Sequence, residues 1–238
     1  MTGTKHVVEG CRRHGVRRLV FISSPSVVFN GQDQANLTEE APYPVRFASI
    51  YSQTKAEAEQ IVHTLQFGTL ETVILRPKAL FGPGDTSLLP RLLAAAGQNR
   101  LPQIGDGTNR VDLTYIDNVV LAVQLALTQA TAVGNIYHIT NGESPLLWEV
   151  VRHVLKELKY PSHLRPIDYR VAYGLAALLE AQSALTHREP LLTRYTVAVL
   201  GRTQTYDTNS ARKSLNYSPK ISISEGIERT IAAIKGKS

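Results

Sequence analysis

The chain has 238 residues, of which 43% are hydrophobic and 19% charged, with a formal net charge of +6 and one cysteine. This composition is typical of a globular protein, and a single cysteine excludes an intramolecular disulfide framework and a multi-cysteine zinc site. The arginines and lysines are scattered, without interleaved aromatic residues, so the charge does not indicate a nucleic-acid partner.

The first part of the chain alternates predicted helices with buried strands. Gly15 is a typical helix stop, and the run LVFI that follows is apolar throughout, as in a strand of a parallel sheet that is buried on both faces. The predicted elements are a helix over 4–14, a strand over 19–22, a loop over 25–50, a helix over 51–65 and a strand over 71–77.

The second part continues the alternation. Asp117 is predicted to cap a helix, Ser144-Pro145 to open another, and His138 to be a hydrogen-bonded structural histidine. The predicted elements are helices over 88–96, 118–128, 145–158, 167–200 and 224–234, and strands over 111–116 and 135–140. Because alternating strands and helices need crossover connections, the pattern predicts an α/β fold with a parallel sheet.

Tyr51 and Lys55 open a predicted helix four residues apart, so they share one helix face. An ammonium beside a phenol favours the phenolate and lets the tyrosine act as a general acid or base. The pair alone also arises by chance on surface helices. Its context adds weight, because Ser23 and Ser24 follow the strand at 19–22, where catalytic hydroxyls of open α/β sheets lie; a Ser-rich turn is the simpler reading of those serines.

Four motifs together resemble the extended short-chain dehydrogenase/reductase family: VFISSPSVVFNG, YSQTKAEAE, LRPKALFGPGD and VDLTYIDNVV. Within that family the chain is most similar to the 3β-hydroxysteroid dehydrogenase and sterol-4-carboxylate 3-dehydrogenase branch. The resemblance implies a Rossmann-like parallel sheet with a smaller C-terminal α/β region. We expect residues 1–100 to form the partial Rossmann catalytic half. Residues 101–238 mainly form the substrate-binding region, with some segments returning to the sheet.

The resemblance also implies the roles of individual residues. Tyr51 would be the acid/base, Lys55 would lower its pKa and hold the cofactor ribose, and Ser24 would bind the substrate oxygen, with Ser23 as the competing assignment. The further residues implied are Pro77, Ala79, Leu80 and Ser23 beside an NAD or NADP cofactor, and Ser26 and Arg110 beside the substrate. Arg110 is equally well explained as a solvated loop arginine, and the histidines lack metal-ligand spacing, so no metal is expected.

No G-x-x-G-x-x-G turn follows a strand in this sequence. Such a turn meets the cofactor pyrophosphate in the family. We therefore expect the first strands of the cofactor domain to be missing, the cofactor to bind poorly, and the strand at 19–22 to lie at an exposed sheet edge.

The sequence thus favours an NAD(P)-dependent oxidoreductase for a sterol-like or other bulky, lipophilic substrate. The apolar segment 173–185 supports a lipophilic substrate and a peripheral membrane contact. Two alternatives stay open: a nucleotide-sugar epimerase or dehydratase, and a catalytically impaired remnant or interaction protein. With no secretory signal and no apolar run of the ~18 residues that span a bilayer, we expect a cytoplasmic protein. A homodimer is also compatible with the sequence.

Overall fold

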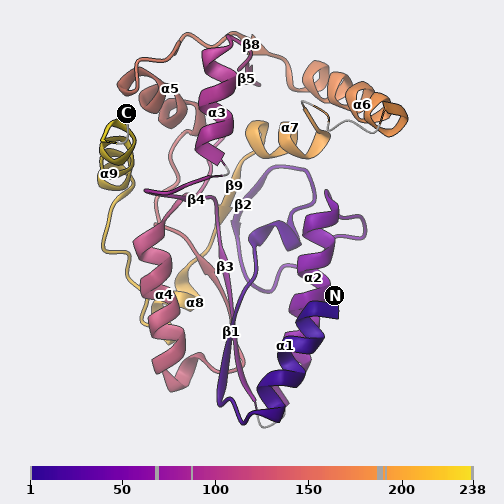
Figure 1. Cartoon of the computed structure of the whole chain (residues 1–238), viewed down its shortest axis with the longest axis vertical. Helices are drawn as coiled ribbons and strands as arrows, with labels where there is room; N and C mark the ends of the chain where they lie inside the picture. Colours follow the sequence, from indigo (N-terminus) through magenta and orange to yellow (C-terminus); the bar gives the residue numbers. More distant parts are fainter. Residues whose placement is uncertain (1, 68–69, 87, 187–189, 191, 237–238) are drawn as a thin grey trace.

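The structure is a computed structural model that describes residues 2–67, 70–86, 88–186, 190 and 192–236. Figure 1 shows a lower part built around parallel strands and an upper part made mainly of helices. The described residues contain no helix that is both long enough and apolar enough to cross a bilayer.

The lower part is a three-stranded parallel sheet in the order β1-β3-β7. Among the described residues β1 pairs only with β3, its first four residues are half-buried and Ile22 is exposed, as expected for a sheet edge. β3 is the central strand and is buried from its second residue onward. The elements up to β3 are α1 (Thr2–Arg13), β1 (Arg18–Ile22), η1 (Pro25–Val28), β2 (Gln34–Leu37), α2 (Ile50–His63), η2 (Thr64–Phe67) and β3 (Glu71–Pro77).

Helices cover both faces of this sheet (Figure 1). Successive side chains of β3 point to opposite faces. Ile74 packs with Val8 of α1 and Val62 of α2, whereas Val73 and Leu75 pack with α4 on the other face. The predicted sheet and its flanking helices are therefore confirmed. The middle elements are β4 (Leu80–Phe81), α3 (Leu88–Gly97), β5 (Gln103–Ile104), β6 (Thr114–Tyr115), α4 (Ile116–Thr128), η3 (Ala130–Ala132) and β7 (Ile136–Ile139).

The upper part has its own core around the fully buried Trp148. Helices α3, α5, α6 and α7 contribute to it, and short parallel pairs such as β2-β9 and β5-β8 connect distant segments. The remaining elements are α5 (Leu147–Glu157), β8 (Pro166–Ile167), α6 (Tyr169–Thr186), α7 (Arg194–Gly201), β9 (Gln204–Tyr206), α8 (Asn209–Ser214) and α9 (Ile223–Lys235).

Two predicted elements are wrong in detail. The predicted loop over 25–50 contains η1 and β2, and β2 forms because β9, far along the chain, pairs with it. The predicted helix over 167–200 is two helices, since Thr193 caps α7 by accepting a hydrogen bond from the Thr196 N–H.

The two predicted helix starts around Asp117 and Ser144 also need correction. Tyr115 pairs with Phe81 and is itself the N-cap of α4, so Asp117 lies inside the first turn and forms an ion pair with Arg229. α5 begins at Leu147 because Leu146 still forms an antiparallel bridge with Arg110.

Candidate active site

Three functional side chains follow one another at four-residue intervals on α2: Tyr51, Lys55 and Glu59. This spacing places them on one face of the helix. Ser49 starts the helix, because its hydroxyl accepts a hydrogen bond from the Ser52 N–H at 3.1 Å. Tyr51, in the first turn, is 52% exposed, and Glu59, two turns further on, is fully buried. The face therefore runs from solvent into the core.

Lys55 connects this helix to the carboxyl end of β1. Its Nζ donates a hydrogen bond to the Ile22 carbonyl at 2.8 Å and lies 5.2 Å from the centre of the Phe21 ring. Burial lowers the pKa of Lys55, and the Glu59 carboxylate opposes that shift. In the part of the chain that the structure describes, no hydrogen bond joins Lys55 to Tyr51. The phenol is thus open to an incoming group.

Ser23 and Ser24 have different environments, although they are adjacent. Ser23 is buried and donates its hydroxyl to Glu59. Ser24 is half-buried, and its Oγ accepts a hydrogen bond from the Ser26 N–H at 3.2 Å, which caps η1. Because the Ser24 oxygen only accepts in this contact, its O–H remains available to donate to a ligand.

Glu59 is the centre of a buried network that the sequence interpretation missed. Its Oε2 accepts from Ser23 Oγ and from Arg76 Nε at 3.1 Å, and its Oε1 accepts from Arg76 Nη2 and from Tyr43 Oη at 2.8 Å. Burial and the Glu59 charge raise the pKa of Tyr43, which remains a donor. This network joins α2 to the ends of β1 and β3. The signal in the sequence was the position of Glu59, four residues after Lys55.

The carboxyl end of β3 lies beside the serines. Ile22 is opposite Leu75 in the sheet. Ser24 and Pro77 each lie two residues further along, so they lie at corresponding positions at the carboxyl end of the sheet. Ala79 then turns the chain with a left-handed φ of 42°, and Leu80 is partly exposed. The structure thus brings the residues predicted to flank a nicotinamide to the same edge as Ser24.

Lys78 points away from this edge into the protein. Its Nζ donates to Gln204 Oε1 at 2.6 Å, and burial lowers its pKa to about 8, which the Asp112 carboxylate opposes. Gln204 belongs to β9, so this contact fixes the segment after β3 to the second half of the chain. The RPK sequence gave no sign that its lysine is buried.

Tyr195 of α7 is a second tyrosine at the site, and the sequence interpretation missed it. Burial raises the pKa of Tyr195, the nearby Tyr51 phenol adds to the shift, and the Ser52 and Ser26 hydroxyls oppose it. Tyr195 also lines a cleft of about 540 Å³. The segment after η1 and the segment before α2 form one side of this cleft, and α6 and α7 form the other. The second half of the chain therefore forms a wall of the cleft and brings Tyr195 near Tyr51.

The two predicted substrate residues differ in position. Ser26 is buried, near Tyr195. Arg110 is exposed, donates to the Ser144 carbonyl at 2.8 Å, and is not among the residues that line the cleft. Its contacts with Ser144, Thr203 and Leu146 hold loop segments together and do not bring it to Tyr51.

His138 is not the hydrogen-bonded histidine that the sequence predicted. It is fully buried on β7, with its ring 4.7 Å from that of Tyr206, and both ring nitrogens lack a hydrogen-bond partner. Burial and the Arg76 guanidinium lower its pKa to about 3. The ring is therefore neutral and packs as an aromatic group. Among the described residues no cluster of histidine, cysteine and carboxylate side chains is suited to a metal.

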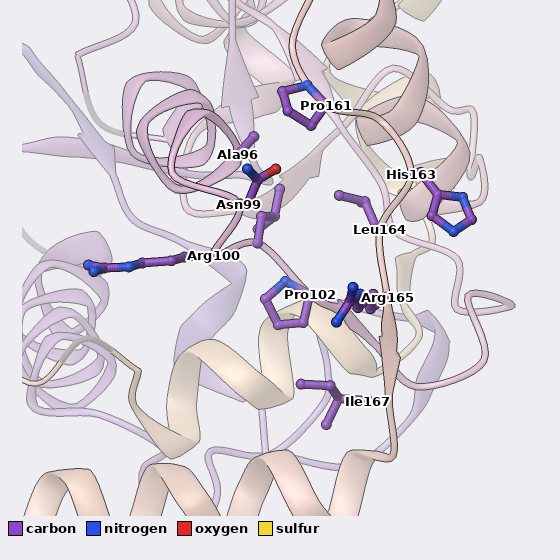
Figure 2. A pocket seen from close by; sticks show the side chains of 10 residues that line it. Ala96, Asn99, Arg100, Pro102, Pro161, His163, Leu164, Arg165 and Ile167 are labelled. Carbon is purple, nitrogen blue, oxygen red and sulfur yellow. The ribbon is translucent and has the colours of Figure 1, made fainter.

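A cavity of about 620 Å³ lies elsewhere, between the end of α3 and β8. Arg100, His163 and Arg165 contribute to its lining, but Figure 2 shows that Arg100 and His163 point away from each other. Because its charged groups do not converge and none of the predicted site residues lines it, this cavity is separate from the candidate active site.

The model of the 3-beta hydroxysteroid dehydrogenase/isomerase family matches residues 1–167. The 2-alkyl-3-oxoalkanoate reductase of Stenotrophomonas maltophilia is 39% identical over 97% of this chain and 72% of its own length. The decarboxylating sterol-4-alpha-carboxylate 3-dehydrogenase of Mus musculus is 36% identical over 96% of this chain and 66% of its own length.

Solved structures show the same fold at low identity. The dTDP-glucose 4,6-dehydratase of Bacillus anthracis matches with a TM-score of 0.71 and 20% identity, over 99% of this chain and 67% of that one. An epimerase from Methanothermobacter thermautotrophicus matches with a TM-score of 0.74 and 20% identity, over 99% of this chain and 64% of that one. These likenesses confirm the Rossmann-like α/β fold.

Proposed function

The chain belongs to the 3-beta hydroxysteroid dehydrogenase/isomerase family, as its motifs predicted, and on this basis we propose that it interconverts a hydroxyl and a ketone with a nicotinamide cofactor. Its relatives are named as dehydrogenases and reductases, which agrees with the predicted oxidoreductase class. The observation that carries the proposal is the placement of Tyr51 and Lys55 on α2 beside Ser24 at the end of β1.

Each residue has a distinct role in this proposal. The Tyr51 phenol gives a proton to the reacting oxygen in reduction and removes it in oxidation. Lys55 places a positive charge on the same helix face, which favours the phenolate. Ser24 donates its O–H to the substrate oxygen and orients it. A proton transfer by a positioned side chain of this kind contributes roughly 10²–10⁴-fold to the rate.

The residues at the sheet edge fit a nicotinamide riboside. Tyr51, Leu80 and part of Lys55 are exposed there, and Pro77 and Ala79 form the adjacent backbone, so this surface is open to a flat ligand. When it is bound, the cofactor supplies or accepts the hydride. The described residues form no glycine-rich turn for a pyrophosphate, and weak cofactor binding by this chain is therefore part of the proposal. Isothermal titration with NAD and with NADP measures that affinity, and a micromolar dissociation constant would contradict it.

The relatives suggest a substrate class. Both names place the reacting oxygen on the carbon beta to a carboxylate: a 3-oxoalkanoate in one and a 4-carboxylate beside a 3-hydroxyl in the other. We propose that this chain acts on a lipophilic 3-hydroxy or 3-oxo carboxylic acid. α6 carries exposed leucines, and its Tyr173 lines the same cleft as Tyr195. These apolar side chains suit an apolar substrate body.

A substrate panel tests the proposal. The protein is incubated with NADH or NADPH and a 2-alkyl-3-oxoalkanoate, a 3-oxosteroid or a dTDP-hexose, and the nicotinamide absorbance is followed. Oxidation of the cofactor with the oxo acid is the expected result. The sugar nucleotide is also incubated with NAD and its products are separated by chromatography, because epimerisation and dehydration leave the amount of NADH unchanged overall; its conversion alone would support the epimerase or dehydratase alternative. No conversion of any substrate at saturating cofactor would support the impaired remnant.

Three further properties are also proposed. A homodimer and a peripheral membrane contact both have a candidate surface in α6, where Leu178 is 70% and Leu185 is 83% exposed. Cytoplasmic localisation is the third. Sedimentation of the protein with and without lipid vesicles separates the first two, because a dimer sediments faster in both conditions.

A further inference from the structure

The cleft that Tyr195 lines has a cationic lining, and Tyr195 itself lies near the Tyr51 phenol. Arg46 lies in the segment before α2, Arg194 lies at the start of α7, and Arg202 follows that helix. One carboxylate, Glu180, lines the same cleft. The cleft therefore offers several guanidinium groups to a ligand, and which of them is free decides what that ligand can be.

Two of these arginines already have partners. Arg194 Nε lies 2.6 Å from Glu180 Oε2, and its backbone N–H donates to Glu180 Oε1 at 2.8 Å. Arg202 Nη1 lies 3.0 Å from Asp33 Oδ2, and its guanidinium stacks on the Tyr169 ring at 3.9 Å. Their charges are compensated within the protein, and they serve as walls of the cleft.

Arg46 is different. It is exposed, and in the described part of the chain it has no hydrogen bond or ion pair. It precedes Tyr51 by five residues, a stretch that spans at most ~17 Å even when fully extended. Phe47 and Ala48, between the two, also line the cleft. Arg46 thus lines the same cleft as Tyr195, which in turn lies near the proposed acid/base Tyr51.

We propose that Arg46 binds the carboxylate of the substrate in this cleft and thereby determines the specificity for 3-hydroxy and 3-oxo acids. This inference rests on the proposed function and adds the group that recognises the acid. A guanidinium matches a carboxylate through two parallel N–H···O bonds, which fixes the orientation of the ligand as well as its charge. The tyrosines Tyr173 and Tyr195 provide aromatic walls for the adjacent carbons.

The charge count favours a carboxylate over a diphosphate. One uncompensated guanidinium balances one negative charge, whereas a nucleoside diphosphate would bring two or more toward a cleft that also holds Glu180. Buried or half-buried charges without partners are costly. A monoanionic acid is therefore the ligand that this lining fits.

Binding without cofactor tests the inference separately from turnover. Isothermal titration is carried out with a 2-alkyl-3-hydroxyalkanoate and with its methyl ester, on the unmodified protein, on Arg46→Gln, and on Arg12→Gln. Arg12 is the matched control, because its side chain is also exposed and has no hydrogen bond or ion pair to any residue that the structure describes, but it lies near the C-terminal end of α1. Circular dichroism verifies that both variants are folded.

The expected result is that the acid binds at least tenfold more tightly than the ester, that Arg46→Gln removes this difference, and that Arg12→Gln keeps it. Equal binding of acid and ester, no binding of the acid, or unchanged acid binding by Arg46→Gln would overturn the inference. Failure of the proposed function looks different: acid binding would depend on Arg46, but cofactor would not be consumed. Turnover of acid and ester with equal kcat/KM would leave the redox function standing and remove the role of Arg46.

Discussion

The Lys55 ammonium donates a hydrogen bond of 2.8 Å to the backbone carbonyl of Ile22, the last residue of β1. Ser23 and Ser24 follow Ile22 directly, so this one contact fixes the helix that carries Tyr51 to the strand end that carries the serines. The lysine therefore has a structural partner as well as a proposed electrostatic role, and the two can be separated by experiment.

Replacing Lys55 with methionine should reduce turnover far more than stability. Loss of one partly exposed hydrogen bond costs about 1 kcal/mol of unfolding free energy, whereas loss of the charge near Tyr51 should lower kcat about a hundredfold or more. Urea unfolding and steady-state kinetics measure the two effects. Gln53→Ala is the control on the same helix, since among the described residues the exposed Gln53 side chain forms a hydrogen bond only to Glu57. Equal losses of activity in both variants would contradict the role of Lys55.

Ser23→Ala should mainly reduce stability, whereas Ser24→Ala should mainly reduce turnover. The first removes a donor from the buried Glu59 carboxylate and should destabilise the protein by about 1–3 kcal/mol. The second removes the cap of η1, which costs about 0.5–1 kcal/mol, and it should lower turnover because the substrate oxygen loses its donor. If Ser23→Ala lost turnover per folded molecule and Ser24→Ala did not, the two assignments would have to be exchanged.

The Glu59–Arg76 pair should behave as a buried ion pair. Glu59→Leu or Arg76→Met alone leaves one buried charge without its partner and should cost ~3–5 kcal/mol. The double variant Glu59→Leu with Arg76→Met should be more stable than either single variant, because no charge is then left buried. Guanidinium unfolding of the three variants gives the coupling energy, and additive losses would show that the pair is not coupled.

The buried His138 should make the folded protein less stable as the pH falls. Its folded pKa of about 3 lies below its unfolded value, so the unfolded state binds the proton and stability falls as the pH drops through about 6.5 toward 3. Between about pH 7.5 and about pH 5.5 this group should cost ~1.3 kcal/mol. Over the same pH range the His138→Leu variant should therefore lose ~1.3 kcal/mol less unfolding free energy than the unmodified protein. Parallel urea titrations measure it, and identical pH dependence in both proteins would contradict a neutral buried ring.

The sequence was sufficient for the local features of the site. The helix that carries Tyr51 and Lys55, the strand that ends before Ser23, and β3 from Glu71 to Pro77 all lie where periodicity and apolar runs predicted them. Their meeting at one sheet edge followed from the parallel order, because carboxyl ends of parallel strands share an edge.

Contacts between residues that lie far apart in the chain could not be predicted from local sequence patterns. Tyr195 lies near Tyr51 and belongs to α7, which the apolar pattern did not separate from α6. Lys78 is buried and bonds to Gln204 of β9, a strand that forms by pairing with β2. The buried charge of Glu59 was invisible for the same reason. A glutamate on a helix is usually solvated, and only the packing of α2 against Arg76 shows that this one is not.

The most direct test of the account is turnover by Tyr51→Phe. The substitution removes one hydroxyl of a half-exposed side chain, and this hydroxyl forms no hydrogen bond to the described residues, so the free energy of unfolding should stay within about 0.5 kcal/mol of the unmodified value. Reduction of a 2-alkyl-3-oxoalkanoate, followed by the nicotinamide absorbance at saturating cofactor, should fall by about 10²-fold or more. A folded Tyr51→Phe protein that reduces the oxo acid at the unmodified rate would contradict the proposed mechanism.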